Sequence, residues 1–196
     1  MERFRSNPAK PYENSRREDG ESPLQGIDPA LIGRAAIVGL GANMQNPGEM
    51  IGEALRRLDA MAELTLLAGS SIYLTEPQSG PPGQDWFHNA AAFFDSRLTP
   101  AGLLQRLLSV EADMGRVRRE PNGPRVIDLD LLAFGAEVVN DPPDLVLPHP
   151  RMHQRRFVMA PLAEMAPDWR HPLLGRTAIE LLRDIPPDGQ GFRKLL

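Results

Sequence analysis

Six segments between residues 35 and 134 differ in hydrophobic periodicity, and their order limits the fold more than any other feature of the sequence. Runs typical of strands end at glycine or other turn residues, and two amphipathic segments repeat apolar side chains every three or four residues. The order predicts an α+β fold, a ferredoxin-like split βαβ sandwich whose mainly antiparallel sheet is covered by helices, rather than a doubly wound parallel sheet. The expected elements are a strand at 35–43, a helix at 46–61, strands at 64–75 and 89–98, a helix at 99–115 and a strand at 126–134.

Both predicted helices carry signals at their ends. Asn46 stands where a residue can cap the first helix, and Pro47 follows at the first helical position. Thr99 and Pro100 open the second helix in the same way, and Gly115 closes it.

Glu111 follows Leu107 and Leu108 by four and three residues, so we expect its carboxylate on the core-facing side of this helix.

We expect the chain to form one domain with an extension at each end. A length of 196 residues suits one domain with a real core. Residues 1–33 hold few large apolar side chains and are expected to be a flexible extension, with the domain at 34–170 and a C-terminal helix near 179–185 plus a loose tail within 171–196. No apolar run approaches the ~20 residues of a membrane span, the N-terminus does not resemble a secretory signal, and cysteine is absent, which together favour a cytoplasmic protein.

Positive charge is clustered although the net charge is −4. A local basic cluster in a mildly acidic protein favours a compact anionic ligand over a nucleic-acid backbone, which draws a broad basic face. For any single arginine, a solvated charged loop remains the simpler interpretation. The clustered arginines are Arg116, Arg118, Arg119 and Arg125, with a second group of Arg151, Arg155 and Arg156.

Two aspartates interrupt the apolar strand predicted at 126–134. Side chains alternate along a strand, so Asp128 and Asp130 are expected on one face, about 6.5–7 Å apart, while their neighbours face the core. Two such carboxylates require a compensating cation. Arginines or solvent satisfy an isolated pair, but Mg²⁺ is also held by one or two carboxylates together with water and substrate phosphate. The nearby arginines favour phosphoryl transfer, and no GxxxxGK[ST] phosphate loop is present.

Six motifs lie between residue 35 and about residue 167: GLGAN (39–43), SIYLTEP (71–77), WFHNA (86–90), VEADMGRVRRE (110–120), GPRVIDLDLL (123–132) and LPHPRMHQRRFVMAPL (147–162). The combination of GPRxxDxD with LPHPR and RFVMxPL at this distance is specific. In composition and order, the set resembles the 6-hydroxymethyl-7,8-dihydropterin pyrophosphokinases of folate biosynthesis.

The resemblance implies transfer of the β,γ-pyrophosphoryl group of ATP to the pterin hydroxymethyl oxygen, with release of AMP. It implies that Asp128 and Asp130 hold two Mg²⁺ ions and that Arg116 and Arg125 neutralise phosphate charge. It also implies ATP contacts at Glu111, Arg118, His149 and Arg155, and a pterin pocket of Thr75, Phe87, Asn89 and Phe157. The expected partners are these two small molecules, with no nucleic acid, no membrane and a monomeric chain.

Two other functions are open on the sequence alone. Many family members carry a basic residue and an aromatic before GPR, whereas this chain has Pro121 and Asn122 in a loop that closes over the nucleotide in the family. A binding module that has lost its chemistry is therefore one alternative, and a metal-dependent nuclease using the aspartate pair is another. Taken singly, Phe87 and Phe157 are more easily explained as core residues than as residues that stack on a ligand.

Overall fold

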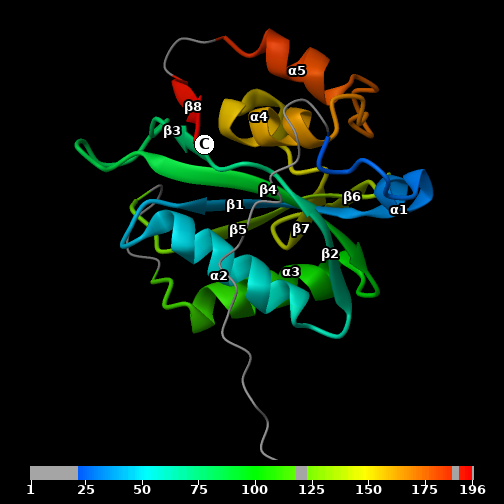
Figure 1. The fold of residues 1–196 in the computed structure, drawn as a ribbon, viewed down its shortest axis with the longest axis horizontal. Coiled ribbons are helices and arrows are strands. Elements are labelled where there is room, and N and C mark those ends of the chain that lie inside the picture. The colour runs from blue at the N-terminus through cyan, green and yellow to red at the C-terminus, as the bar shows by residue number, and fades with distance from the viewer. Residues whose placement is uncertain (1–21, 118–122, 187–189, 196) are drawn as a thin grey trace, which may run out of the picture.

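The computed structural model describes residues 22–117, 123–186 and 190–195, which form an antiparallel sheet with helices on both faces (Figure 1). The sheet has six strands in the order β5-β1-β4-β3-β8, with β2 also pairing with β4. Helices α2 and α3 cover one face and α4 covers the other, as the predicted α+β sandwich requires. The elements are α1 (Pro29–Arg34), β1 (Ala36–Ala42), α2 (Pro47–Asp59), β2 (Leu64–Gly69), β3 (Tyr73–Thr75), β4 (Phe87–Ser96), α3 (Pro100–Asp113), β5 (Asp128–Phe134), β6 (Val139–Asp141), β7 (Leu145–Leu147), the 3-10 helix η1 (Met152–Gln154), α4 (Arg156–Met165), α5 (Ala178–Asp184) and β8 (Phe192–Lys194).

Strand β1 lies inside the sheet and is covered on both faces, which explains its continuous apolar run. Val38 and Leu40 pack in the core formed with α2 and α3, whereas Ile37 packs in a second core formed with α4. The same alternation divides β4, where Phe94 belongs to the first core and Phe93 to the second. The two cores fix the sheet between its helices.

The predicted helix starts are correct in position and differ in detail. Thr99 caps α3 with its side chain, which accepts a hydrogen bond from the backbone N–H of Gly102. Asn46 is the cap residue of α2, but its side chain makes no capping bond and instead donates to Glu49 Oε2 at 3.0 Å. Asn46 therefore stands at the predicted cap position of α2 but makes no side-chain capping bond.

The single strand expected at 64–75 is two strands, β2 and β3, both paired with β4. Two serine side chains explain the interruption. Ser70 Oγ accepts from the backbone N–H of Ala91 at 3.0 Å, and Ser71 Oγ donates to Glu164 Oε1 on α4 at 2.8 Å. These bonds replace the regular ladder and tie the break to α4.

Both ends of the described chain pack more tightly than expected. Residues 22–33 were expected to be flexible, but they include most of α1, and Leu24 is 5% exposed in the core under α4. The predicted helix near 179–185 is confirmed as α5. The tail expected to be loose contains β8, which pairs with the outer edge of β3. Among the described residues, no helix has the length and apolar character needed to span a bilayer.

Candidate active site

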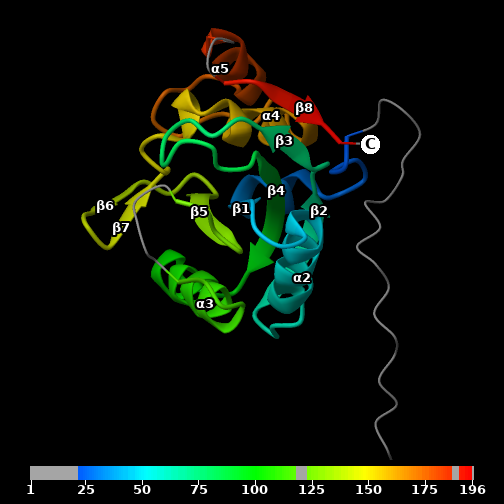
Figure 2. The same cartoon turned by 90° about the vertical axis from the view of Figure 1, so that its left-hand side faces the viewer.

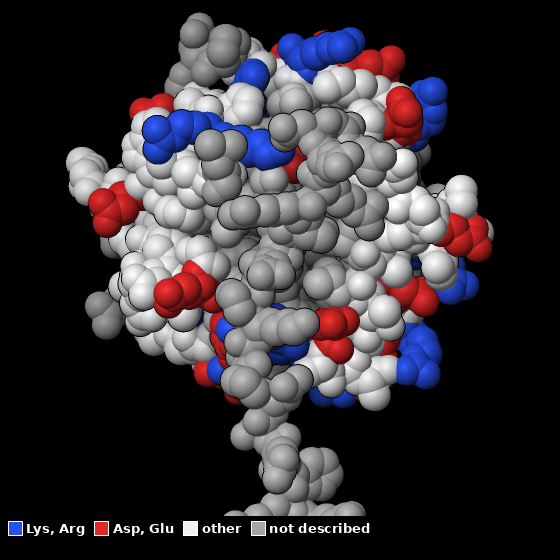
Figure 3. Space-filling model, viewed as in Figure 1, with Lys and Arg blue, Asp and Glu red and all other residues white. Residues whose placement is uncertain are grey.

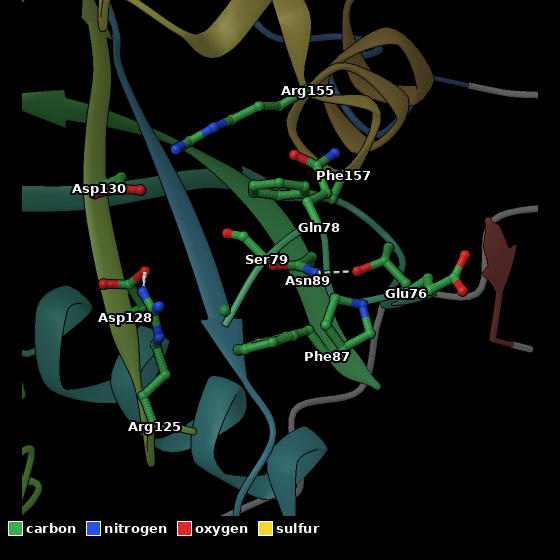
Figure 4. A pocket seen from close by; sticks show the side chains of 13 residues that line it. Glu76, Gln78, Ser79, Phe87, Asn89, Arg125, Asp128, Asp130, Arg155 and Phe157 are labelled. Carbon is green, nitrogen blue, oxygen red and sulfur yellow. Dashed lines mark hydrogen bonds and ion pairs between the residues drawn. The ribbon is translucent and has the colours of Figure 1, made fainter. Parts of the chain in front are cut away.

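A pocket opens where β1, β3, β4 and β5 meet the first turn of α4 (Figure 4). It lies on the α4 side of the sheet, because the alternate residues of β5 pack on the opposite side with α2 and α3. The loop after β3, residues 76–79, forms another wall. Most of the predicted site residues line this pocket: Thr75, Phe87, Asn89, Arg125, Asp128, Asp130, Arg155 and Phe157.

The two aspartates share the pocket face of β5, as strand alternation predicts. Asp128 is ion-paired on both oxygens: Oδ1 lies 2.5 Å from Nη1 of Arg116, and Oδ2 contacts Nη1 of Arg125. No ion pair within the described residues reaches Asp130, toward which the Arg155 side chain extends (Figure 4). The pair is therefore asymmetric, with one neutralised carboxylate and one that is less compensated.

Burial and the charge of Asp128 together raise the pKa of Asp130 from 3.8 to about 6. The positive charges of Arg155, Arg125 and Arg116 oppose this rise without cancelling it. At pH 7 Asp130 is thus mainly ionised, and its charge lowers the free energy of unfolding of the native state. A cation bound beside Asp130 would remove this destabilisation.

Glu111 lies on the side of β5 opposite the pocket and hydrogen-bonds to the strand backbone between the two aspartates. It is 3% exposed on α3, and its Oε1 accepts a hydrogen bond at 2.7 Å from the backbone N–H of Leu129, the residue between the two aspartates. The same oxygen is ion-paired with Arg116, which in turn contacts Asp128. The core-facing position predicted for Glu111 is confirmed, and the structure places this carboxylate behind β5 rather than on the pocket wall.

Two aromatic rings form opposite sides of the pocket. Phe87 begins β4 and Phe157 lies in the first turn of α4, and Figure 4 shows the side chains of Ser79 and Asn89 between the levels of the two rings. The guanidinium of Arg125 lies 5.6 Å from the centroid of Phe87, and that of Arg155 lies 5.4 Å from the centroid of Phe157. Such a slot suits a flat aromatic ligand whose substituent points toward charged groups.

Polar groups form the inner end of this slot. Asn89 Nδ2 donates to Thr75 Oγ1 at 2.6 Å, and both residues are buried. Gly41 faces Asn89 across the β1–β4 pairing, and a Cβ at this position would lie 2.9 Å from Asn89 Oδ1. Sequence reasoning did not assign a role to Gly41, although glycine inside a strand is a signal of close approach.

Asn43 is a second residue that sequence reasoning missed. Its Oδ1 accepts from the backbone N–H of Arg125 at 2.9 Å, and its Nδ2 donates to the backbone oxygen of Asp85 at 3.1 Å. It thereby joins the segment that carries Arg125 to the segment that leads into Phe87. The asparagine that ends GLGAN was the available signal, since asparagine often bonds nearby backbone.

The other predicted residues lie outside the pocket wall or outside the described chain. His149 follows β7, where burial and the charges of Arg155 and Arg151 lower its pKa to about 4, so its imidazole is neutral at pH 7. Arg118, Pro121 and Asn122 fall outside the described residues. A larger, more apolar hollow between residues 22–33 and 165–175 contains none of the predicted residues.

The pocket fits a hard divalent cation shared with a ligand rather than held by protein alone. Within the described residues, no group of three or more histidine, aspartate or glutamate side chains is placed to hold a metal ion. Asp128 and Asp130 nevertheless offer carboxylate oxygens on one face, and Mg²⁺ is commonly bound by one or two carboxylates plus substrate phosphates.

Comparison with known proteins decides the family. The profile of 7,8-dihydro-6-hydroxymethylpterin-pyrophosphokinase (HPPK) matches residues 37–167. The chain belongs to the HPPK family. It is 45% identical over 154 residues to the 2-amino-4-hydroxy-6-hydroxymethyldihydropteridine pyrophosphokinase of Methylorubrum extorquens, covering 79% of this chain and 95% of that protein. The protein of the same name from Pseudomonas aeruginosa is 43% identical over 152 residues, covering 78% and 92%.

Solved structures of HPPK domains agree with the fold. The HPPK-DHPS of Plasmodium falciparum, solved in its wild-type form with pteroate, superposes with a TM-score of 0.60 at 15% identity, over 76% of this chain and 42% of that one. The HPPK-DHPS A437G form with SDX-DHP from the same organism gives a TM-score of 0.61 at 16% identity, over 76% and 45%. The predicted family, ferredoxin-like fold and enzyme class are confirmed, because HPPK members are ATP-dependent pyrophosphokinases.

Proposed function

We propose that this chain transfers the β,γ-pyrophosphoryl group of ATP to the hydroxymethyl oxygen of 6-hydroxymethyl-7,8-dihydropterin, releasing AMP. Asp128 and Asp130 are the proposed ligands of two Mg²⁺ ions. One observation carries the proposal: a single pocket is lined by a carboxylate pair and by two aromatic side chains on opposite sides. Membership of the HPPK family supports the reaction and its two substrates.

The proposed pterin site uses the slot between Phe87 and Phe157. The two rings stack on the faces of the bicycle, and Asn89 recognises its edge because a carboxamide offers both a donor and an acceptor. Thr75 holds the Asn89 amide in place through its hydroxyl. The hydroxymethyl group would then be directed toward β5 and the aspartates.

The proposed triphosphate site uses the arginines around β5. Arg116 and Arg125 now occupy both oxygens of Asp128. Mg²⁺ held by Asp128 and Asp130 would supply charge neutralisation on the phosphates. Arg116 and Arg125 would then neutralise phosphate oxygens from beside the aspartates, a role for which the planar guanidinium is well suited. Such a site needs positioning and charge neutralisation more than a protein nucleophile.

We also assign roles to the predicted site residues that belong to neither of these two groups. Arg155 lies on the pocket wall beside Phe157, where it reaches both the pterin side and the phosphate side. We assign nucleotide contact to His149 in its neutral form, and to Arg118. Glu111 acts through Arg116 and Leu129, to which it is bonded.

The face of the molecule shown in Figure 3 does not favour the nuclease alternative. On the face shown in Figure 3, basic and acidic side chains are interspersed and do not form a continuous basic stripe. Proteins that hold nucleic acid through its backbone gather lysine and arginine on one face.

Product analysis tests the proposal. The purified chain is incubated with ATP, Mg²⁺ and the pterin, and nucleotides are separated by chromatography. The expected result is AMP in equal amount to the pterin diphosphate and only when the pterin is present. ADP as the pterin-dependent product would contradict pyrophosphoryl transfer, and binding of both substrates without AMP would favour the binding module.

A further inference from the structure

The last described segment, residues 190–195, lies beside the pterin half of the pocket although it is beyond the family match at 37–167. Strand β8 pairs with the outer edge of β3, with Phe192 opposite Thr75 (Figure 2). Thr75 in turn holds the Asn89 amide. The segment therefore completes the sheet at the strand that carries part of the proposed pterin site.

Gln190 bridges two walls of that pocket. Its Oε1 accepts from Gln78 Nε2 at 2.5 Å and from the backbone N–H of Arg156 at 2.9 Å. Its Nε2 donates to the backbone oxygen of Gln154 at 3.4 Å. Gln78 belongs to the loop after β3, whereas Arg156 starts α4 immediately before Phe157. One carboxamide thus connects the loop wall to the turn that presents an aromatic wall.

The neighbouring residues reinforce this bridge. The backbone N–H of Glu76 donates to the oxygen of Gly191 at 3.0 Å, and a Cβ on Gly191 would lie 3.4 Å from a Glu76 carboxylate oxygen. The guanidinium of Arg156 lies 4.9 Å from the Phe192 ring centroid. Lys194 Nζ is 3.1 Å from a carboxylate oxygen of Glu164 on α4. The segment is attached to both α4 and the loop.

We infer that Gln190 positions the pterin site by setting the loop at 76–79 against the first turn of α4, while the backbone pairing of β8 with β3 holds the segment in place. This inference rests on the proposed function. Walls held in place before the ligand arrives need less ordering on binding, which increases affinity. The aspartates lie on β5, at the opposite end of the strand order from β8, so the segment acts on the pterin rather than on the triphosphate.

Steady-state kinetics on point variants test this role. Gln190→Ala removes both acceptor contacts, and the loss of hydrogen bonds of ordinary strength raises the pterin KM about tenfold. The KM for ATP is expected to change less than about twofold. Gln190→Glu keeps an acceptor oxygen for Gln78 and for the Arg156 N–H, so it restores most of the pterin affinity.

Arg193→Ala is the matched control, because Arg193 lies on β8 and the described residues provide no ion pair or hydrogen bond for its side chain. It is expected to match the wild type in both KM values, and thermal unfolding of all variants confirms that each is folded. Equal changes in the two KM values, or an unchanged pterin KM in Gln190→Ala, would overturn the inference. A wild-type chain that forms no pterin-dependent AMP would instead refute the proposed function.

Discussion

Replacing Asp130 by asparagine should stabilise the fold while removing activity. The carboxylate of Asp130 is partly buried beside Asp128 and is ion-paired with no cation of the described chain, whereas asparagine has nearly the same shape and no charge. The native state without metal therefore contains an unfavourable charge that the substitution removes. Sites that bind charged ligands often carry this kind of cost.

The magnitude follows from the pKa of this carboxyl. Folding raises the pKa of Asp130 from 3.8 to about 6, and each pH unit between the unfolded and folded values corresponds to ~1.4 kcal/mol. Ionised Asp130 therefore destabilises the native state by up to about 3 kcal/mol. A gain of about 1–3 kcal/mol for Asp130→Asn corresponds to several degrees in Tm for a domain of this size.

The pH dependence has a definite sign. Because folding raises the pKa of Asp130, this residue does not destabilise the native state below its unfolded pKa of 3.8, where it is protonated. Its contribution to the free energy of unfolding falls as the pH rises through about 6. The advantage of Asp130→Asn over the wild type is thus expected to be small near pH 4, to grow between pH 4 and 6, and to stay constant above. Thermal and urea unfolding with EDTA, from pH 4 to 8, measure this difference in stability.

Asp128→Asn is the matched control at the same strand face. Asp128 is ion-paired with Arg116 and Arg125, so its replacement is expected to give no gain and a loss of about 1 kcal/mol. Equal stabilities for the two variants, or a gain for Asp130→Asn that does not depend on pH, would refute the reasoning.

Three further substitutions test other parts of the site. Gly41→Ala places a methyl group 2.9 Å from Asn89 Oδ1, so the pterin KM should rise about tenfold or more with little change in the ATP KM. Similar effects on both KM values would contradict a pterin role for Asn89. Phe157→Ala should weaken pterin binding far more than nucleotide binding, as titration of each ligand will show, and equal weakening would argue against the aromatic slot. Glu111→Ala should lower the free energy of unfolding by about 2–3 kcal/mol because it leaves the buried Leu129 N–H without its carboxylate acceptor, whereas Glu111→Gln, which keeps an acceptor, should cost less; urea unfolding that ranks them otherwise would be inconsistent with this support.

The sequence predicts those features of the site that depend on local periodicity. Alternation along β5 places Asp128 and Asp130 on one face, and helical spacing places Glu111 toward the core. Family resemblance then selects Phe87 and Phe157, which the structure brings to opposite sides of one pocket. Periodicity and motif order are sufficient here because each residue's direction is set by its own element.

Features that depend on contacts between distant segments could not be predicted in this way. The difference between the two aspartates arises because Arg116, which follows α3, and Arg125 both pair with Asp128. The break between β2 and β3 depends on Ser71 meeting Glu164, which is 93 residues away in sequence. Strand β8 is polar and short, and its pairing with β3 uses backbone groups that leave no hydrophobic pattern.

The most direct test of the central claim is the Mg²⁺ dependence of pterin-stimulated AMP formation in the wild type, Asp128→Asn and Asp130→Asn. The account predicts that the wild-type reaction requires Mg²⁺ and the pterin together. Each variant should remain folded and lose at least about a thousandfold in rate at saturating Mg²⁺, because charge neutralisation of the phosphates supplies much of the catalysis. A variant that keeps its rate within about tenfold of the wild type would show that the aspartate pair does not hold the catalytic metal.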